Sequence, residues 1–351
     1  MSPDADRAGG VVRSLAGIID GLLEATVVGS FSRVGAAVRS RTQGWDDPPR
    51  LDGKVIMVTG ASSGIGRAAS IALARTGAHL LLVGRNPERL AATRRSAVAV
   101  RGGGRVEISS VDVVDPVALG AFAEHVTASE ERLDGLVHSA GALFSDYQTS
   151  TDGTELTVAT NVLAPFRLSL LVSPLLRRST SSVIVTVSSG GMYTQRFDLD
   201  RLELTADGFN GVTAYARAKR AQVVLAHEWG RRWGCDGVAS YAMHPGWVDT
   251  PGLSTGLPAF AHLGPLLRTP DQGADTVAWL AANGPRTQDS PSARRDQRRE
   301  GAGGIWLDRR CRREYYLPTT YRSPANRRRD GDRLWAWCAA RTIPQAAQRL
   351  Q

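Results

Sequence analysis

Cysteine and lysine are both scarce in this chain of 351 residues. The three cysteines, Cys235, Cys311 and Cys338, are odd in number and far apart, so neither a disulfide framework nor a cysteine metal site is predicted. A reducing, cytoplasmic location is therefore expected. Lysine occurs only as Lys54 and Lys219 among 43 basic residues. Because arginine is used everywhere else, each lysine indicates a position that needs a compact ammonium group.

Long apolar runs are also missing. No run approaches the roughly 18 apolar residues of a membrane span. Asp4 and Asp6 precede the first apolar stretch, which argues against a secretory signal peptide. The six histidines form no ligand pair at helical spacing, so no metal site is predicted.

The formal charge of +9 is confined to one end of the chain. Residues 1–284 contain 27 basic and 27 acidic residues, whereas residues 285–351 contain 16 Arg against 7 acidic residues. A balanced body argues against a nucleic-acid-binding protein, so no nucleic-acid partner is expected. The basic end is interpreted as a solvated, flexible segment, with contact to a membrane or nucleic acid as the alternative.

The most informative stretch is 55–66, where an apolar, β-branched run stops at a glycine and a small-residue loop leads into a helix. This pattern predicts the strand, tight turn and helix N-terminus that begin a dinucleotide-binding βαβ unit; a glycine-rich turn without a ligand is the alternative. Gly60 permits the sharp turn, Gly64 lets a pyrophosphate approach the main chain, and Gly66 lets the helix pack close to the strand. The predicted phosphate-binding residues are Gly60, Ser62, Ser63, Gly64, Ile65 and Gly66.

Further strands alternate with helical patterns along the chain. Strands are predicted at 79–83, 106–111, 133–137, 182–187 and 238–243. Helices are predicted at 67–75, 87–100, 152–178 and from 215 to about 233, with an insertion at 192–212. The alternation predicts the α/β class: a Rossmann-type doubly wound parallel sheet of about seven strands, with helices on both faces.

The residues at two strand ends indicate which coenzyme binds. An acidic residue after the second strand would accept hydrogen bonds from a free ribose 2′-hydroxyl, whereas an Arg would pair with a 2′-phosphate. The second strand here leads to Arg85, so NADP(H) is predicted over NAD(H). Arg85 as a solvated residue at a helix start is the alternative. Asp112 closes the third strand and is placed to reach the adenine edge.

Composition and periodicity divide the chain into five segments. They are an amphipathic helical extension and linker (1–48), a Rossmann-type NAD(P)-binding catalytic domain (49–284), an Arg-rich insertion predicted to be disordered (285–300), the last strand and closing segment (301–318) and a basic tail (319–351). In the extension, Leu15, Ile19 and Leu22 follow helical spacing. This helix is predicted to pack on its own body or on a second subunit. A membrane surface is the alternative, so peripheral membrane contact stays open beside the cytoplasmic location.

Tyr215 and Lys219 are four residues apart, so they lie on one face of the predicted helix, about one turn apart. Hydride transfer needs a group that moves a proton to or from the substrate oxygen. A free phenol has a pKa near ~10, and a neighbouring cation is expected to lower it. Tyr215 is therefore the predicted general acid/base, with Lys219 as its cation.

These motifs together resemble the short-chain dehydrogenase/reductase family over roughly residues 51–310. They follow the family's order: Thr59-Gly60-x-x-x-Gly64-x-Gly66, Asn161, Ser188-Ser189, Tyr215-x-x-x-Lys219 and Pro245-Gly246-x-x-x-Thr250. A closer likeness, through stretches 185–192, 215–224, 244–252 and 273–280, is to the subgroup of dehydrogenase/reductase family member twelve and its bacterial relatives. One departure is that His138 and Ser139 stand where the family usually has two asparagines.

The resemblance implies the roles of the remaining site residues. Ser189 would hold the substrate oxygen, with Ser188 as the alternative, and Asn161 would anchor a water that links Lys219 to solvent. Lys219 would also hydrogen-bond the nicotinamide ribose. The other implied cofactor contacts are Ala140, Gly141, Tyr215, Pro245, Gly246, Val248 and Thr250. The family is often dimeric or tetrameric, so a homo-oligomer is one expectation.

The favoured function is NADP(H)-dependent interconversion of a lipophilic alcohol and its ketone or aldehyde. The apolar residues of 253–267, interspersed with glycine and proline, predict a mobile lid over such a substrate; simple packing is the alternative. A second hypothesis is an NADP(H)-binding sensor or scaffold without turnover, motivated by His138 and Ser139. A third is a membrane-associated protein that uses its N-terminal helix and basic tail.

Overall fold

Eight strands form one sheet in the computed structural model, which describes residues 17–100, 104–251, 263–287 and 304–342. The strand order is β3-β2-β1-β4-β5-β6-β7-β8, and every neighbouring pair is parallel except β7 and β8. The strands are β1 (Val55–Thr59), β2 (His79–Gly84), β3 (Val106–Ser110), β4 (Gly135–His138), β5 (Ser182–Val187), β6 (Val238–Met243), β7 (Ile305–Leu307) and β8 (Arg310–Arg312). The predicted Rossmann-type fold is confirmed, with β8 as an additional antiparallel edge strand.

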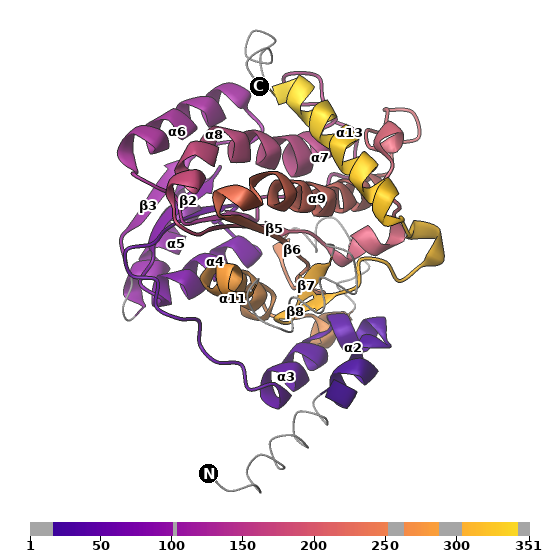
Figure 1. Ribbon diagram of the computed structural model, residues 1–351, viewed down its shortest axis with the longest axis horizontal. Coiled ribbons are helices and arrows are strands. Elements are labelled where there is room, and N and C mark those ends of the chain that lie inside the picture. The colour runs from indigo at the N-terminus through magenta and orange to yellow at the C-terminus, as the bar shows by residue number, and fades with distance from the viewer. Residues whose placement is uncertain (1–16, 101–103, 252–262, 288–303, 343–351) are drawn as a thin grey trace, which may run out of the picture.

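Helices cover both faces of this sheet (Figure 1). One face carries α4 (Gly64–Arg75), α5 (Pro87–Ala99) and α11 (Pro270–Thr287); the other carries α6 (Pro116–Ser129), α8 (Ala164–Arg178) and α9 (Gly211–Trp233). Alternate residues of β1 explain this division: Ile56 and Val58 lie in the first core, and Val55 and Met57 lie in the second. Two apolar cores therefore enclose the strands, as expected for a parallel sheet.

The register of the central strands brings their carboxyl ends to one edge. Thr59 at the end of β1 pairs with Val83 of β2 on one side and His138 of β4 on the other, and Val187 pairs with Met243. The loops that follow these strands therefore lie side by side. In an open α/β sheet, this edge is where ligands bind.

Two helices differ from the sequence-based boundaries. The segment predicted as one helix over 152–178 begins at Leu156, because the Glu155 carboxylate caps it by accepting from the backbone N–H groups of Thr157 and Val158. The short helix α7 (Leu156–Val158) is followed by a π-helical turn, Ala159–Leu163, before α8. Helix α9 begins at Gly211, since the Asn210 side chain caps it by accepting from the Thr213 N–H.

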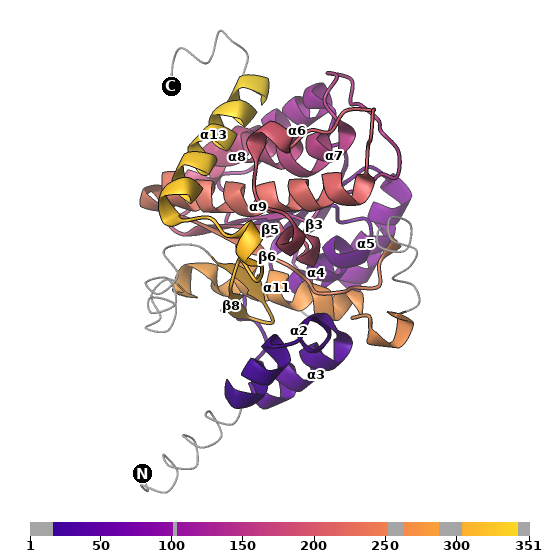
Figure 2. The same cartoon turned by 90° about the vertical axis from the view of Figure 1, so that its right-hand side faces the viewer.

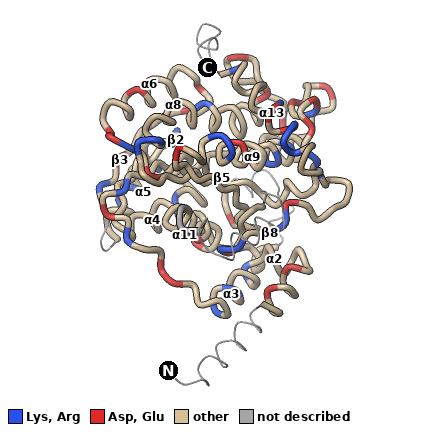
Figure 3. The backbone as a smooth tube through the Cα atoms, in the orientation of Figure 1, with Lys and Arg blue, Asp and Glu red and all other residues tan. Residues whose placement is uncertain are grey.

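The predicted basic tail is corrected over residues 324–342, which form helix α13 (Pro324–Thr342) packed along α9. Leu334 and Cys338 are fully buried, and the Arg232 guanidinium lies 4.4 Å from the ring centroid of Trp335. Figure 3 shows acidic residues among the arginines of this helix, where Asp332 pairs with Arg232 at 2.8 Å. Part of the basic excess therefore belongs to the folded body rather than to a solvated segment.

Two other sequence-based expectations fall largely outside the described residues. They concern the Arg-rich insertion at 285–300 and the predicted lid at 253–267. Within the described part of the basic segment, Arg309 pairs with Asp275 at 2.7 Å and lies over Trp45, so it is also part of the body.

One helical segment among the described residues, 156–178, is long and apolar enough by mean hydropathy to cross a membrane. The sequence predicted a helix over 152–178 but no apolar run long enough to span a membrane. In the structure, 78% of its apolar window is buried within the protein, where it forms part of the core beside α6 and α9. Burial of this extent is typical of the core helix of a domain.

Candidate active site

A cleft of about 690 Å³ opens at the carboxyl edge of the sheet. All of the predicted cofactor-binding residues line it: Gly60, Ser62, Ser63, Gly64, Ile65, Gly66, Arg85, Asp112, Ala140, Gly141, Tyr215, Lys219, Pro245, Gly246, Val248 and Thr250. Ser188 and Ser189 also line it, whereas Asn161 lies fully buried behind the wall. The structure thus brings together residues from the loops that follow β1 to β6 and from the two helices α4 and α9.

The glycine loop has the geometry expected of a phosphate cradle. Gly60 adopts φ +70°, and a Cβ there would lie 2.6 Å from the backbone nitrogen of Ala140. Gly64 adopts φ +51° at the start of α4, where a Cβ would approach Thr250 Cγ2 to 3.2 Å. Both positions suit glycine because other residues rarely adopt a positive φ. The first residues of α4, Gly64 to Gly66, line the cleft, and the N-terminus of a helix can hold a pyrophosphate through its free N–H groups.

Basic side chains gather at the opposite end of the cleft, after β2. Arg85 is largely exposed and its Nη1 lies 4.0 Å from Asp112 Oδ2. Arg89, one turn into α5, lines the same end together with Asn86, whose side chain caps α5. These residues fit the adenosine end of a dinucleotide, and the two Arg side chains can hold an additional phosphate there. Sequence analysis identified Arg85 and Asp112 but missed Arg89, although its spacing of four from Arg85 could have indicated it.

Tyr215, Lys219 and Ser189 converge on the middle of the cleft. The Lys219 Nζ lies 5.3 Å from the centroid of the Tyr215 ring, and the Ser189 hydroxyl hydrogen-bonds to Tyr215. Ser188 differs from Ser189, since its hydroxyl donates to the backbone oxygen of Lys219 at 2.8 Å. Ser188 therefore binds the backbone of α9 at Lys219, well inside the helix, while Ser189 faces the phenol.

Burial dominates the electrostatics of this group. It raises the pKa of Tyr215 to about 12, an effect that the Ser189 hydrogen bond only partly opposes, and it lowers the pKa of Lys219 to about 7. The direction for Tyr215 is opposite to the one predicted from its lysine neighbour, because burial removes the phenol from water and disfavours its charged form. At neutral pH the phenol is therefore a proton donor in this arrangement.

Lys219 is held by two acceptors, one on Val187 in the cleft wall and one on Gln222, which does not line the cleft. Its Nζ donates to Val187 O and to Gln222 Oε1, both at 3.0 Å. Gln222 is 1% exposed and was missed by sequence analysis, although residues three apart on a helix share one face. Two of the three ammonium protons are thus engaged by the protein, which leaves the third for the cleft.

Asn161 lies beside this lysine in the π-helical turn. Its Nδ2 donates to Ala142 O at 2.9 Å and to Thr157 O at 2.8 Å, and its Oδ1 is buried without a protein partner among the described residues. A Cβ at Gly141 would lie 2.8 Å from Asn161 Oδ1 and 3.1 Å from Lys219 Nζ. Gly141 therefore lies directly against both polar atoms.

His138, which stands with Ser139 where the family usually has two asparagines, fits inside the core. The His138 Nε2 lies 2.8 Å from Ser169 Oγ, and the ring stacks on Trp229 with centroids 5.5 Å apart. Burial lowers the pKa of His138 to about 3, so the ring is neutral at physiological pH. Ser139 lines the cleft beside Ala140. The substitution at 138 thus fills space behind the cleft and leaves its wall formed by small residues.

The fold and motifs are similar to those of several known proteins. The short chain dehydrogenase family model matches residues 54–256. Dehydrogenase/reductase SDR family member 12 of Bos taurus is 36% identical over 233 residues, which cover 66% of this chain and 73% of the bovine one. Retinol dehydrogenase 14 of Mus musculus is 30% identical over 297 residues, covering 79% and 84% of the two chains.

A solved structure supports the same assignment. A Shigella flexneri chain, assigned as a short chain dehydrogenase and solved in complex with NADP, superposes with a TM-score of 0.52 at 26% identity, covering 66% of this chain and 92% of that one. The resemblance predicted from the motifs, including that to the member-twelve subgroup, is confirmed. The chain belongs to the short-chain dehydrogenase/reductase family.

Proposed function

We propose that this protein, an oxidoreductase that acts on CH–OH donors with NAD(P), prefers NADP(H) and interconverts a lipophilic alcohol and its ketone or aldehyde. The observation that carries the proposal is the convergence of Tyr215, Ser189 and Lys219 in the cleft whose far end holds Arg85. A proton donor, a hydroxyl and a cation meet where the loops of a dinucleotide fold also meet. This is the arrangement that proton-coupled hydride transfer requires.

The cofactor chemistry fits the cleft because its glycines leave the main chain accessible. The loop 60–66 would hold the pyrophosphate, and Arg85 with Arg89 would hold a 2′-phosphate. A nicotinamide coenzyme bound there supplies or accepts the hydride. The residues of the chain perform the remaining tasks of orientation and proton movement.

Tyr215 is proposed as the general acid/base. In the reductive direction its protonated phenol donates a proton to the substrate oxygen, and in the oxidative direction its deprotonated form accepts one. The Ser189 hydroxyl would hold the substrate oxygen beside Tyr215. Lys219, fixed by Val187 O and Gln222, stabilises negative charge that develops on the phenol oxygen. The Asn161 Oδ1, which has no protein partner among the described residues, would hold a water that exchanges this proton with solvent.

The apolar part of the cleft wall supports a lipophilic substrate. Leu143, Phe144 and Leu156 line the same cleft as Tyr215. Apolar walls with a few polar groups are typical of small-molecule sites. Among the similar proteins, mouse retinol dehydrogenase 14 is named for a lipophilic alcohol.

Tyr215→Phe tests the mechanism. Removing the hydroxyl should lower turnover by ~10²-fold or more, because general acid/base catalysis contributes that much, while NADPH binding stays within a few-fold of wild type. Turnover is followed by NADPH absorbance with a panel of lipophilic ketones and aldehydes. Tyr147→Phe is a control, since that ring packs edge-on against Phe209 and does not line the cleft. Near-wild-type turnover in the first variant would refute the role of Tyr215. NADPH binding without turnover of any carbonyl compound in wild type would favour the sensor instead.

A specific observation also favours peripheral contact with an anionic membrane. Figure 2 shows α2 (Val27–Phe31) and α3 (Arg33–Thr42) projecting from the body. The apolar side chains on the outside of this region are each more than half exposed: Ile18, Leu22, Val27, Val28 and Val34. Its two acids, Asp20 and Glu24, turn inward to arginines, so the outward charges are Arg33 and Arg41.

An apolar surface with basic residues suits the interface of an anionic bilayer. Leu22→Asp should reduce cosedimentation with phosphatidylserine-containing vesicles about tenfold or more, since it places a charge where apolar burial is needed. Val117→Asp, on the exposed face of α6, is the matched control. Equal binding by wild type and both variants would rule out this surface.

A further inference from the structure

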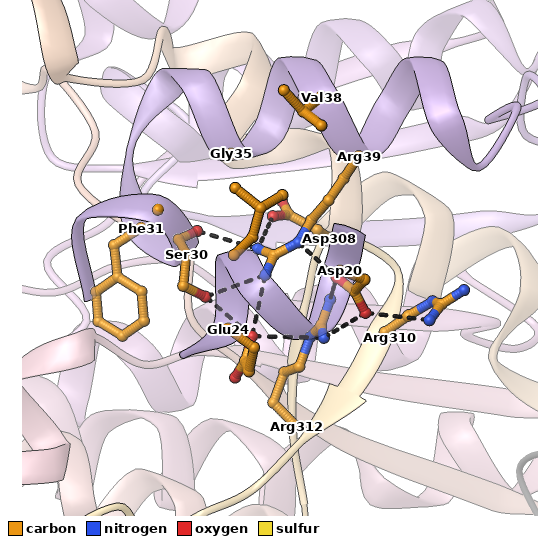
Figure 4. Close-up of polar contacts among 12 residues, drawn as sticks. Asp20, Glu24, Ser30, Phe31, Gly35, Val38, Arg39, Asp308, Arg310 and Arg312 are labelled. Carbon is orange, nitrogen blue, oxygen red and sulfur yellow. Dashed lines mark hydrogen bonds and ion pairs between the residues drawn. The ribbon is translucent and has the colours of Figure 1, made fainter. Parts of the chain in front are cut away.

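One arginine joins the N-terminal helices to the sheet. Arg39 on α3 is completely buried, and its guanidinium pairs with Asp20 at 2.7 Å, Asp308 at 2.7 Å and Glu24 at 3.0 Å. It also donates to the backbone oxygen of Ser30 at 3.1 Å. Figure 4 shows these acceptors pointing toward Arg39 from three separate segments. The helical turns of 17–24, α2 and the turn after β7 are thus fixed to one side chain.

Asp308 extends the network toward the cleft. Its carboxylate is shared with Arg268, which is 1% exposed and pairs with it at 2.6 and 2.9 Å. Burial alone would raise the pKa of Asp308, but Arg268 and Arg39 hold it below the usual value of 3.8. Arg268 also donates to Phe31 O at 3.0 Å and Ser30 O at 2.7 Å. A buried carboxylate with two guanidiniums is costly to disrupt from either side.

The network ends on the loop that follows β6. The Trp247 N–H donates to Phe31 O at 2.9 Å, and the Arg268 backbone pairs with Trp247 O and with the Asp249 N–H. Gly246 adopts φ +75°, and a Cβ there would lie 2.6 Å from Phe31 O. The backbone of α2 therefore lies against the segment whose neighbours Pro245, Val248 and Thr250 line the cleft.

The Phe31 ring reaches the second loop of the site. Its centroid lies 4.6 Å from that of His244, and a Cβ at Gly190 would lie 2.5 Å from its Cε2 atom. Gly190 follows Ser189 directly in the chain. Phe31 is thus packed between the serine loop and the loop 244–250, although it does not line the cleft itself.

We propose that residues 17–42 form an N-terminal clamp in which Phe31 and Arg39 are positioning residues for hydride transfer. Arg39 fixes α2 and α3, and Phe31 holds the loop 244–250 and the loop of Ser189 in one relative position. The reaction is that of the proposed function, on which this role rests. The clamp sets the affinity for the nicotinamide coenzyme by keeping loop 244–250 ordered before binding, since a loop ordered in advance lowers the entropy lost on binding.

Hydrogen exchange tests the clamp in the full chain without a coenzyme. In Phe31→Ala, backbone amides of 244–250 should exchange at least ~10-fold faster than in wild type, because local opening becomes easier. The dissociation constant for NADPH should rise about tenfold in the same variant, with a smaller change in turnover at saturation. Val98→Ala, on the exposed side of α5 and outside both the clamp and the cleft lining, is the matched control and should leave both quantities unchanged.

Two further variants keep the test decisive. If Phe31→Ala does not fold, Phe31→Leu removes the ring contacts with less loss of volume and should show the same pattern at smaller amplitude. Arg39→Met should act through α2 and give faster exchange in both 17–42 and 244–250. Exchange in 244–250 that matches Val98→Ala in every folded variant would overturn the clamp. Absence of turnover in wild type would reject the enzymatic role only, because the exchange result does not depend on it.

Discussion

The buried Lys219 should make the free energy of unfolding depend on pH, and replacing this lysine with an uncharged residue should remove that dependence. Burial lowers the pKa of Lys219 from 10.5 in the unfolded chain to about 7 in the folded protein. Between these values the unfolded state binds a proton that the folded state does not. The free energy of unfolding therefore rises with pH across this window. The cost of burying the ammonium is fully present below pH ~7 and absent above the unfolded value.

The magnitude follows from the same two values. A shift of one unit corresponds to about 1.4 kcal/mol, so the full difference would amount to about 5 kcal/mol. The hydrogen bonds from Nζ to Val187 O and Gln222 Oε1 favour the ammonium and offset part of this cost. We therefore expect a net dependence of about 2–5 kcal/mol. Lys219→Met, which keeps most of the side-chain volume, should remove it.

Urea unfolding followed by circular dichroism from pH 6 to 9.5 measures this effect. The stability of Lys219→Met relative to wild type should be greatest at the acidic end and should decrease as pH rises. Lys54→Met is the matched control, because Lys54 is the other lysine, is partly exposed and pairs with Asp134 at 2.9 Å. Its difference from wild type should stay constant. If the free energies of unfolding of wild type and Lys219→Met change with pH in parallel, the inference that burial lowers the pKa of Lys219 is refuted.

Two further substitutions test the contact with the adenosine end of the coenzyme and the close packing of Gly141 against Lys219. Arg85→Ala should raise the KM for NADPH about tenfold and leave the KM for NADH within a factor of two, because only NADPH has a 2′-phosphate that the arginine can pair with. Equal changes in KM for both coenzymes would contradict this prediction. An equal effect of Arg95→Ala, at an exposed position, would contradict it as well. Gly141→Ala should lower the free energy of unfolding by about 1–3 kcal/mol and reduce turnover, because the added methyl crowds the buried amide and ammonium behind it. Gly120→Ala on α6, where a Cβ meets nothing within 4 Å, should instead raise stability by about 0.5–1 kcal/mol, and urea unfolding of both variants decides the point.

The sheet could be predicted closely because its signal is local. The strands at 182–187 and 238–243 have the predicted boundaries, since each is a buried apolar run flanked by small or polar residues. The predicted first residues of helices were less accurate where a capping side chain determines the point at which the helix begins. In the sequence, Asn210 and Glu155 look like ordinary loop residues. Only the structure shows that their side chains accept hydrogen bonds from backbone N–H groups at the helix starts.

The grouping of Ser189, Tyr215 and Lys219 in one cleft was predictable because these residues occur in compact motifs. The residues that support them were not, since their contacts join distant parts of the chain. Arg268 reaches Phe31 across 237 positions, and no periodicity links the two. α13 was missed for a similar reason: its many arginines suggested a solvated tail, but Leu334 and Cys338 supply a narrow apolar stripe that becomes evident only against α9.

The protonation of Tyr215 shows most clearly what a motif leaves undetermined. The spacing of Tyr215 and Lys219 fixes that a cation lies near a phenol, but the pKa of the phenol also depends on how much water reaches it. In the folded protein, burial raises the pKa of the phenol to about 12, the Ser189 hydrogen bond opposes this only in part, and the proton stays on the oxygen at neutral pH. The same burial weakens the cation itself by lowering the pKa of Lys219 toward neutrality. The ionisation of the pair is therefore set largely by its removal from water, which the spacing of the two residues does not encode.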